Sequence, residues 1–228
     1  MNPVVYAIPV AEPPAIANPT LGRWQSLGYK VIIQIDQSNP CKNDYDAHQV
    51  HQCEYRGYPH AVNTLAEWAV KQMGADIVIT GGVDITPEPF KGAQAIASEF
   101  MEQFPDTFGV MQPIGDDWMT DSNGIPAAAR ICGSPWMGRE FIRRINGGRG
   151  PFWPEYFHFF CDEEMKCVTE KLRILWQRPD LNQRHDHWSR KKVPRPPHLY
   201  PAKANWLDAK DLFLKRKGAG FPGHEPIL

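Results

Sequence analysis

Short runs of consecutive apolar residues alternate along this chain with segments in which apolar residues recur every three or four positions. The first pattern is typical of buried strands and the second of amphipathic helices. The predicted strands are residues 4–8, 30–35, 76–80, 108–111, 130–132 and 172–176. The predicted helices are residues 21–27, 61–73, 93–104, 138–145, a helix beginning near 162, and 206–217. Residues 38–60 are polar and irregular, which predicts a long loop.

The predicted strands are continuous apolar runs rather than alternating ones, and they interleave with helices. Strands of this kind are buried on both faces. The sequence therefore predicts an α/β fold with a mainly parallel central sheet flanked by helices. In such sheets, ligands bind beyond the carboxyl ends of the strands.

Charge is distributed unevenly, although the net charge of −1 indicates no particular partner. From Lys171 onward there are 13 basic and 5 acidic side chains, which leaves 12 and 21 for the preceding part of the chain. A length of 228 residues suits one large domain with an appendage. We expect a catalytic domain over residues 1–190 and a Pro-rich basic extension with a terminal helix over residues 191–228.

The sequence offers no sign of membrane insertion or secretion. It has no run approaching the roughly 20 apolar residues that a spanning helix needs. The first residues have no basic segment followed by a long apolar run, and the five cysteines never form a CxxC motif. These features predict a cytoplasmic protein with reduced thiols.

Two acids follow predicted strands at the edge where ligands bind. Asp36 ends the second strand, and Asp84 lies in the segment ITGGVDITPEP after the third. The glycines let the backbone approach a ligand closely, and a carboxylate there can bind Mg²⁺ or Mn²⁺ shared with a diphosphate. The alternative is that Asp84 is an acidic turn residue capping the next helix.

Two further groups could carry chemistry. Aromatic residues 157–160 precede Asp162, Glu163 and Glu164, and a partly desolvated carboxylate there suits a general base. Acids in a first helical turn are equally explained by capping and the helix dipole. His185 and His187 could place one imidazole on a metal, or could belong to a solvated loop.

A separate set of soft and imidazole ligands offers a zinc alternative. It consists of Cys41, His48, His51 and Cys53, whose spacing matches no standard zinc pattern.

From Tyr6 to Trp188 the order of these features resembles the GT-A glycosyltransferases, especially the inverting, family-2-like group. Residues 7–11 match the turn after that family's first strand, and Asp36 matches the acid after its second. The segment HAVNTLAEWA, with Asn63, looks like its next helix. Where the family has a DxD motif, this chain has Gly82-Val83-Asp84, so one metal ligand is missing. Residues 133–140 and 157–164 fill the later slots, with Cys161 where a glutamate is usual.

The resemblance implies a donor site, a metal and a base. The donor is a nucleotide sugar, expected to be a UDP-sugar. The metal is Mn²⁺ or Mg²⁺, and Asp162 is the catalytic base. The implied enzyme is a hexosyl- or pentosyltransferase. Donor contacts fall on Pro9, Ala11, Asp36, Asn63 and Asp84; metal contacts on Asp84 and His187; and acceptor contacts on Trp136, Trp153, Arg190 and Lys191.

The acceptor and the reaction class stay open. Basic and aromatic residues after His187 suit DNA, as in viral enzymes that glycosylate modified bases, and such an enzyme would act in the host cytoplasm. A lipid-linked sugar at an anionic membrane surface and a structural tail are the alternatives. A nucleotidyltransferase would also use a strand-end acid and a metal. A non-enzymatic zinc and nucleic-acid-binding module is the remaining reading.

Overall fold

A seven-stranded sheet forms the centre of the computed structural model, which describes residues 2–227. The strand order is β3-β2-β1-β4-β7-β6-β8, and only β7 runs antiparallel to its neighbours. The strands are β1 (Val4–Pro9), β2 (Lys30–Asp36), β3 (Gln49–Cys53), β4 (Ile77–Ile79), β6 (Val110–Pro113), β7 (Trp136–Gly138) and β8 (Leu175–Arg178). The predicted mainly parallel α/β sheet is therefore confirmed.

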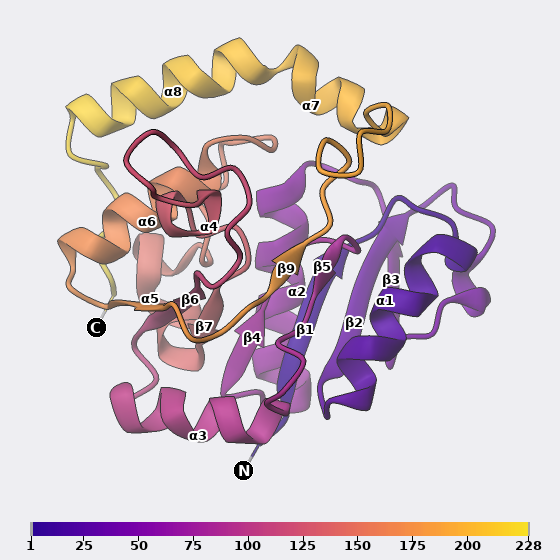
Figure 1. Ribbon diagram of the computed structural model, residues 1–228. Coiled ribbons are helices and arrows are strands. Elements are labelled where there is room, and N and C mark those ends of the chain that lie inside the picture. Colours follow the sequence, from indigo (N-terminus) through magenta and orange to yellow (C-terminus); the bar gives the residue numbers. More distant parts are fainter. Residues whose placement is uncertain (1, 228) are drawn as a thin grey trace.

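Helices cover both faces of this sheet (Figure 1). Two hydrophobic clusters, one on each face, result from the alternation of side chains along β1 and β2. Residues of α2, α5, α6 and α8 contribute to one cluster, and residues of α1 and α3 to the other. The helices are α1 (Pro14–Ser26), α2 (Tyr58–Met73), α3 (Ala93–Gln103), α4 (Ala127–Arg130), α5 (Arg139–Gly148), α6 (Cys161–Lys171), α7 (Tyr200–Ala204) and α8 (Trp206–Gly218).

Three local predictions were wrong. The predicted loop over 38–60 contains β3, a polar strand at the edge of the sheet, and the start of α2. The predicted strand at 130–132 is absent, because the Cys132 amide donates to the Asp162 carbonyl instead of to a strand. The chain turns into α4 just before this point, and the strand forms later, as β7. The first helix begins earlier than predicted, with Pro14 in its first turn, where the missing amide proton costs nothing.

The C-terminal segment is integrated into the fold. After a 3₁₀ turn at Pro197–Leu199, α7 leads into α8, which passes over α6 (Figure 1). Ala209 on α8 and Phe221 after it are buried in the same hydrophobic cluster as α2 and α6. Residues beyond 190 therefore complete the core that the preceding strands and helices leave open. Within residues 2–227, no helix combines the length and apolar character needed to cross a bilayer.

Candidate functional site

Asp84 follows β4 at the carboxyl end of the sheet, on a turn that the core holds in place. The Tyr6 hydroxyl donates to the Gly82 carbonyl at 2.7 Å, and the Ile85 amide donates to the same carbonyl at 3.0 Å. A β-carbon at Gly82 would lie 2.6 Å from Oδ1 of Asp84. Glycine is therefore required at position 82 for Asp84 to keep this conformation.

A two-stranded sheet brings a histidine to Asp84. It consists of β5 (Ile85–Thr86) and β9 (Arg184–His185), which run antiparallel. The His185 side chain donates through Nε2 to Oδ2 of Asp84 at 3.1 Å, and the Asp84 side chain is 38% exposed. Burial opposes ionisation of this carboxyl group, but the hydrogen bond and nearby charge of His185 hold its pKa below the usual value. Asp84 is thus an ionised, accessible carboxylate.

His187 lies in a small stack of rings beside this pair. Its ring centroid is 5.1 Å from that of His185, 4.8 Å from Trp118 and 4.9 Å from Trp188. Burial and the adjacent His185 lower the pKa of His187 to about 4, so its imidazole is neutral near pH 7. Its Nδ1 lies 2.8 Å from the Ser189 hydroxyl, which leaves Nε2 as the nitrogen for a metal ligand. The guanidinium of Arg195 lies over the outer Trp188 ring, 5.0 Å from its centroid.

The buried carboxylate of Asp116 holds the β9 strand in position. Asp116 accepts hydrogen bonds from the His185 amide at 2.9 Å and from Nη1 of Arg190 at 2.9 Å. Arg190 also donates to the His185 carbonyl at 3.1 Å. Asp116 is nearly inaccessible to solvent. It therefore fixes the position of His185 rather than offering a ligand of its own.

A second pair of acids, Asp162 and Glu163, begins α6. Two backbone hydrogen bonds tie this helix start to the end of β4: the Cys132 amide donates to the Asp162 carbonyl at 3.2 Å, and the Thr80 amide donates to the Pro135 carbonyl at 3.3 Å. The short segment from Cys132 to Pro135 thus connects the two acidic groups.

The charges of the two acidic groups act on Tyr6, which is buried, and on Tyr58, which is half-buried. Burial raises the pKa of Tyr6 well above its usual value, and the charges of Asp84 and of Tyr58 raise it further. Burial also raises the pKa of Tyr58, and the charge of Asp162 adds to this effect. The Tyr58 hydroxyl lies 3.2 Å from Oγ1 of Thr80. Both tyrosine hydroxyl groups therefore contact the segment that leads from β4 to Asp84.

Glu163 has a raised pKa. Burial raises its pKa, and the neighbouring Asp162 raises it further. Its Oε2 atom is buried without a hydrogen-bond partner in the described residues. Near neutral pH the pair therefore holds a proton on Glu163, which leaves Asp162 as the candidate proton acceptor.

The predicted donor residues have different environments. Pro9 ends β1 and Ala11 is exposed just beyond it, at the expected edge of the sheet. Asp36 is exposed, and hydrogen bonds from the Ser38 side chain and amide hold its pKa below the usual value. Asn63 is engaged within the fold, because its side chain donates to the Phe152 carbonyl at 2.8 Å and accepts from the Phe152 amide at 3.0 Å. Donor binding by Asn63 is not supported by this arrangement.

The predicted acceptor residues Trp136 and Trp153 are in the core. Trp136 is 0% exposed and donates to the Gln183 side chain. Trp153 is 6% exposed, and the guanidinium groups of Arg149 and Arg216 lie 4.0 and 3.4 Å from its ring. Neither ring has a face for an acceptor, so this prediction was wrong. Trp118 and Trp188 are the tryptophans beside the candidate site, and the adjacency of Trp188 to His187 was the available signal.

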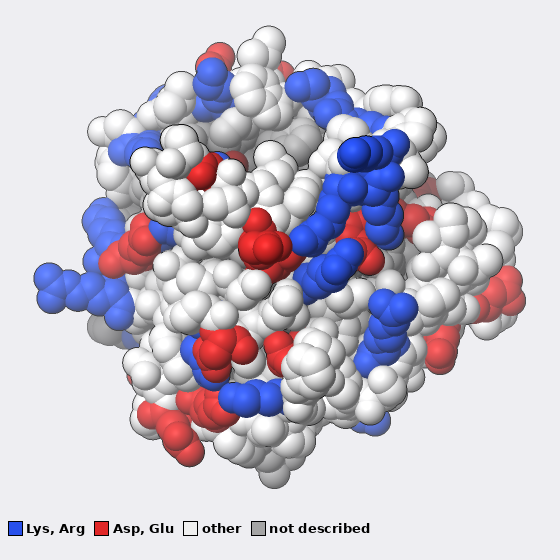
Figure 2. Space-filling model, viewed as in Figure 1, with Lys and Arg blue, Asp and Glu red and all other residues white. Residues whose placement is uncertain are grey.

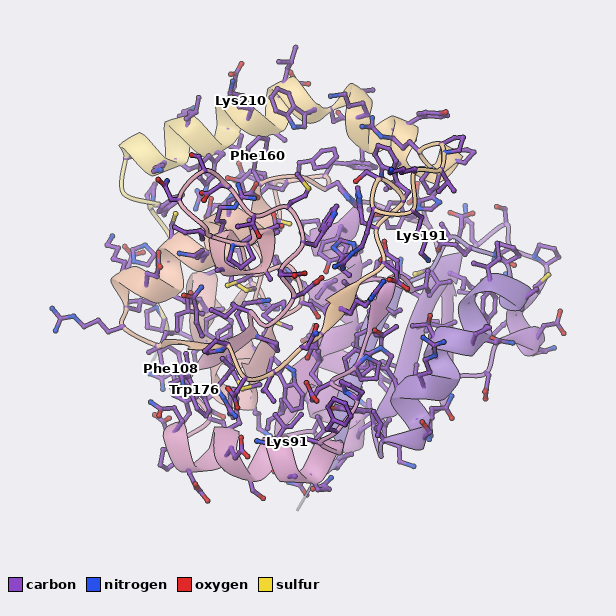
Figure 3. The ribbon with its side chains drawn as sticks, in the orientation of Figure 1. Lys91, Phe108, Phe160, Trp176, Lys191 and Lys210 are labelled. Atoms are coloured by element: carbon purple, nitrogen blue, oxygen red, sulfur yellow. The ribbon has the colours of Figure 1, made fainter. Side chains whose placement is uncertain are left out.

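Basic side chains form a band across the face of the molecule where β9 and the following segment lie (Figure 2). Many of them are paired with acids. Arg190 pairs with Asp116, and both Arg184 and Lys191 pair with Asp186, at 2.7 and 3.7 Å. Lys191 remains half-exposed and points to the surface of this band (Figure 3). The band therefore has a smaller net positive potential than its lysines and arginines alone indicate.

The metal-ligating side chains are few. Within residues 2–227, no group of three or more His, Cys, Asp or Glu side chains is arranged to hold a metal ion, and this includes the cysteines and histidines at 41–53. Asp84 with one neutral imidazole fits a cation whose other ligands are phosphate oxygens and water, as is usual for Mg²⁺. It does not fit a structural zinc centre, which needs four protein ligands.

These features define a mixed α/β protein whose acidic candidate site lies at the carboxyl end of a mostly parallel sheet. The fold is similar to that of S. aureus TarS, with a TM-score of 0.53 and 10% identity to the crystal structure of TarS 1-349. The match covers 78% of this chain and 58% of that TarS chain. A second TarS structure matches with a TM-score of 0.50 and 11% identity, covering 78% of this chain and 35% of that one. No protein-family model and no curated protein sequence matches.

Proposed function

We propose that this protein is a glycosyltransferase that moves a sugar from a nucleoside-diphosphate donor to an acceptor hydroxyl. The observation that carries the proposal is Asp84, an accessible carboxylate bonded to His185 at the carboxyl end of the sheet. Backbone hydrogen bonds at Cys132 and Pro135 link this end of the sheet to the helix start that carries Asp162. The fold supports it, because TarS is a glycosyltransferase. The chain spans 58% of the TarS 1-349 chain, so the assignment of a glycosyltransferase activity to this chain is part of the proposal.

The donor diphosphate lies against Asp84 in this proposal. Asp84 and the neutral imidazole of His187 would hold Mn²⁺ or Mg²⁺ together with the phosphate oxygens. A cation bound there neutralises the charge that develops on the departing nucleoside diphosphate. Pro9, Ala11 and Asp36 lie at the ends of β1 and β2, where the nucleoside of a UDP-sugar would bind.

Asp162 is the proposed general base. It removes the proton from the acceptor hydroxyl as the oxygen attacks the anomeric carbon, which inverts the configuration there. Glu163 keeps its own proton near neutral pH, because burial and Asp162 raise its pKa. The half-buried rings of Trp118 and Trp188 offer aromatic surface for the acceptor in place of Trp136 and Trp153.

Thermal stabilisation by nucleotide sugars, with and without Mn²⁺, tests the proposal directly, because a ligand that binds the folded state raises its apparent stability. A stabilising donor is then incubated with the protein, and the released phosphate compound is identified. Release of nucleoside diphosphate supports glycosyl transfer. Release of pyrophosphate would instead assign a nucleotidyltransferase, and no stabilisation by any nucleotide sugar would refute both.

DNA is the acceptor to test first, because the exposed cations of the band include Lys191 and Lys192. Binding to single-stranded DNA should fall steeply with salt, and Lys191→Ala with Lys192→Ala should make the salt dependence shallower. Binding to anionic vesicles without binding to DNA would point to a lipid-linked acceptor. If neither binds at low salt, the acceptor is a small molecule and the band is structural.

A further inference from the structure

Helix α8 holds the first turn of α6 through a buried ion pair. Glu164, which is 2% exposed, accepts hydrogen bonds from Nε of Arg216 at 2.9 Å and from its Nη2 at 2.7 Å. The Tyr156 hydroxyl donates to the same carboxylate at 2.8 Å. Glu164 directly follows Asp162 and Glu163, so this contact fixes the helical turn that carries both acids.

Arg216 makes two further contacts besides those with Glu164. Its guanidinium stacks on the Trp153 ring at 3.4 Å from the centroid, and its Nη2 also donates to the Pro222 carbonyl at 3.2 Å. The planar fork of an arginine gives a bidentate pair a defined direction, which a single charge does not. The orientation of Glu164 is therefore set by a side chain that has little freedom to move.

A second contact holds the other side of the same turn. Phe160, the residue before α6, has a left-handed backbone with φ 69°, and its ring stacks on Phe213 of α8 with centroids 5.5 Å apart. Figure 3 shows Phe160 beneath α8. Trp206 lies 5.7 Å from the same ring. Contacts with α8 thus lie on both sides of Asp162 and Glu163.

A purely stabilising role does not explain the ion pair well. Desolvation of two charges offsets most of their attraction, and well-packed apolar residues often stabilise a core as much or more. Two apolar side chains in place of the ion pair would have no hydrogen bonds to fix their orientation. An ion pair next to two acids that need a defined orientation is therefore better explained by what it positions.

We propose that Arg216 is a positioning residue that acts through Glu164 to orient Asp162 and Glu163 toward the site bordered by Asp84. The orienting role rests on contacts within the chain. Its catalytic consequence rests on the proposed glycosyltransferase activity.

The test compares Arg216→Lys and the double variant Glu164→Leu with Arg216→Leu against the wild-type protein. The double variant replaces the pair by apolar side chains, so we expect its melting temperature to stay close to that of the wild type. Arg216→Lys keeps the positive charge without the fork. Lys215→Gln is the control, because Lys215 is an exposed neighbour on the same helix.

Hydrogen exchange at the amides of residues 160–165 is the first readout and is independent of any activity. We expect about tenfold faster exchange there in both variants, with no change in α3. The second readout is turnover of a nucleotide sugar, for which we expect kcat to fall about tenfold while KM changes little. Lys215→Gln should leave both unchanged.

Unchanged exchange at residues 160–165 overturns the proposal, as does full kcat in the double variant. If the wild-type protein turns over no nucleotide sugar, the proposed function fails, and the exchange measurement alone then decides whether Arg216 orients α6.

Discussion

Nε2 of His185 lies 3.1 Å from Oδ2 of Asp84, although the two residues are 101 positions apart in the sequence. The contact depends on the pairing of β5 with β9, in which Ile85 lies opposite His185. It also depends on Asp116, which accepts from the His185 amide. The candidate metal site is therefore assembled by strand register rather than by a local motif.

Replacing Asp84 with asparagine should weaken Mn²⁺-dependent binding of UDP by about tenfold or more, because the variant loses the only carboxylate proposed to hold the cation. Isothermal titration calorimetry with and without Mn²⁺ measures the effect. His185→Ala should have a larger effect than His187→Ala, since His185 contacts Asp84 directly. Asp117→Asn is the matched control, because Asp117 is a nearby acid whose side chain is 95% exposed. Equal affinity of wild type and Asp84→Asn for UDP and Mn²⁺ would remove Asp84 from the site.

Asp162→Asn keeps the shape of the side chain but removes the proton acceptor. We expect transfer to fall by roughly a hundredfold or more while donor affinity is retained. Glu163→Gln should keep most of the activity, since burial and Asp162 raise the pKa of Glu163 and keep it protonated near neutral pH. Single-turnover transfer and UDP titration separate the two effects. The reverse order of the two variants would assign the base to Glu163.

The stability of the protein should depend on pH through Glu163. Its pKa is raised in the folded state, so above the carboxyl pKa of an unfolded chain, about 4.3, the folded state binds more protons and loses stability as pH rises. Glu163→Gln removes this loss. Its melting temperature should exceed that of the wild type near about pH 8, with the difference vanishing near about pH 4. Glu155→Gln, at an exposed acid before α6, controls for the lost charge. A difference that is constant with pH would contradict the raised pKa.

Restoring the missing acid of the DxD pattern should not improve the site. A β-carbon at position 82 would lie 2.6 Å from Oδ1 of Asp84, so Gly82→Asp forces that carboxylate to move. We expect weaker Mn²⁺-dependent UDP binding with little loss of stability, because only the end of the Asp84 side chain has to move. Denaturant unfolding and calorimetry measure the two effects. Tighter metal-dependent binding by Gly82→Asp would show that the turn has more room than its contacts indicate.

The central strands and the place of the acids could be predicted because they depend on local pattern. The apolar runs of β1, β2 and β4 are continuous, and Asp84 and Asp162 follow from strand-end and helix-start positions. β3 was missed because it is a polar edge strand, whose pattern differs little from that of a loop.

Other features depend on contacts between distant segments and have no local signature. Trp136 and Trp153 look the same in sequence as the more accessible Trp118 and Trp188, and only the packing of β7 and α8 separates them. The choice of His185 as the partner of Asp84 follows from strand register. The docking of the C-terminal segment depends on Arg216, one of many cations in a region that reads as a solvated extension.

The separation of 52 positions between Glu164 and Arg216 also imposes an order on biosynthesis. The ribosome makes α6 well before α8, so the nascent chain carries Glu164 without the cation that compensates it. A buried, unpaired carboxylate is costly, which keeps the first turn of α6 from settling into the core at that stage. The sheet from β1 to β8 can assemble while the chain is still growing, whereas the turn that carries Asp162 closes only after Arg216 has left the exit tunnel. Any catalytic competence of this protein is therefore acquired only after α8 has been synthesised.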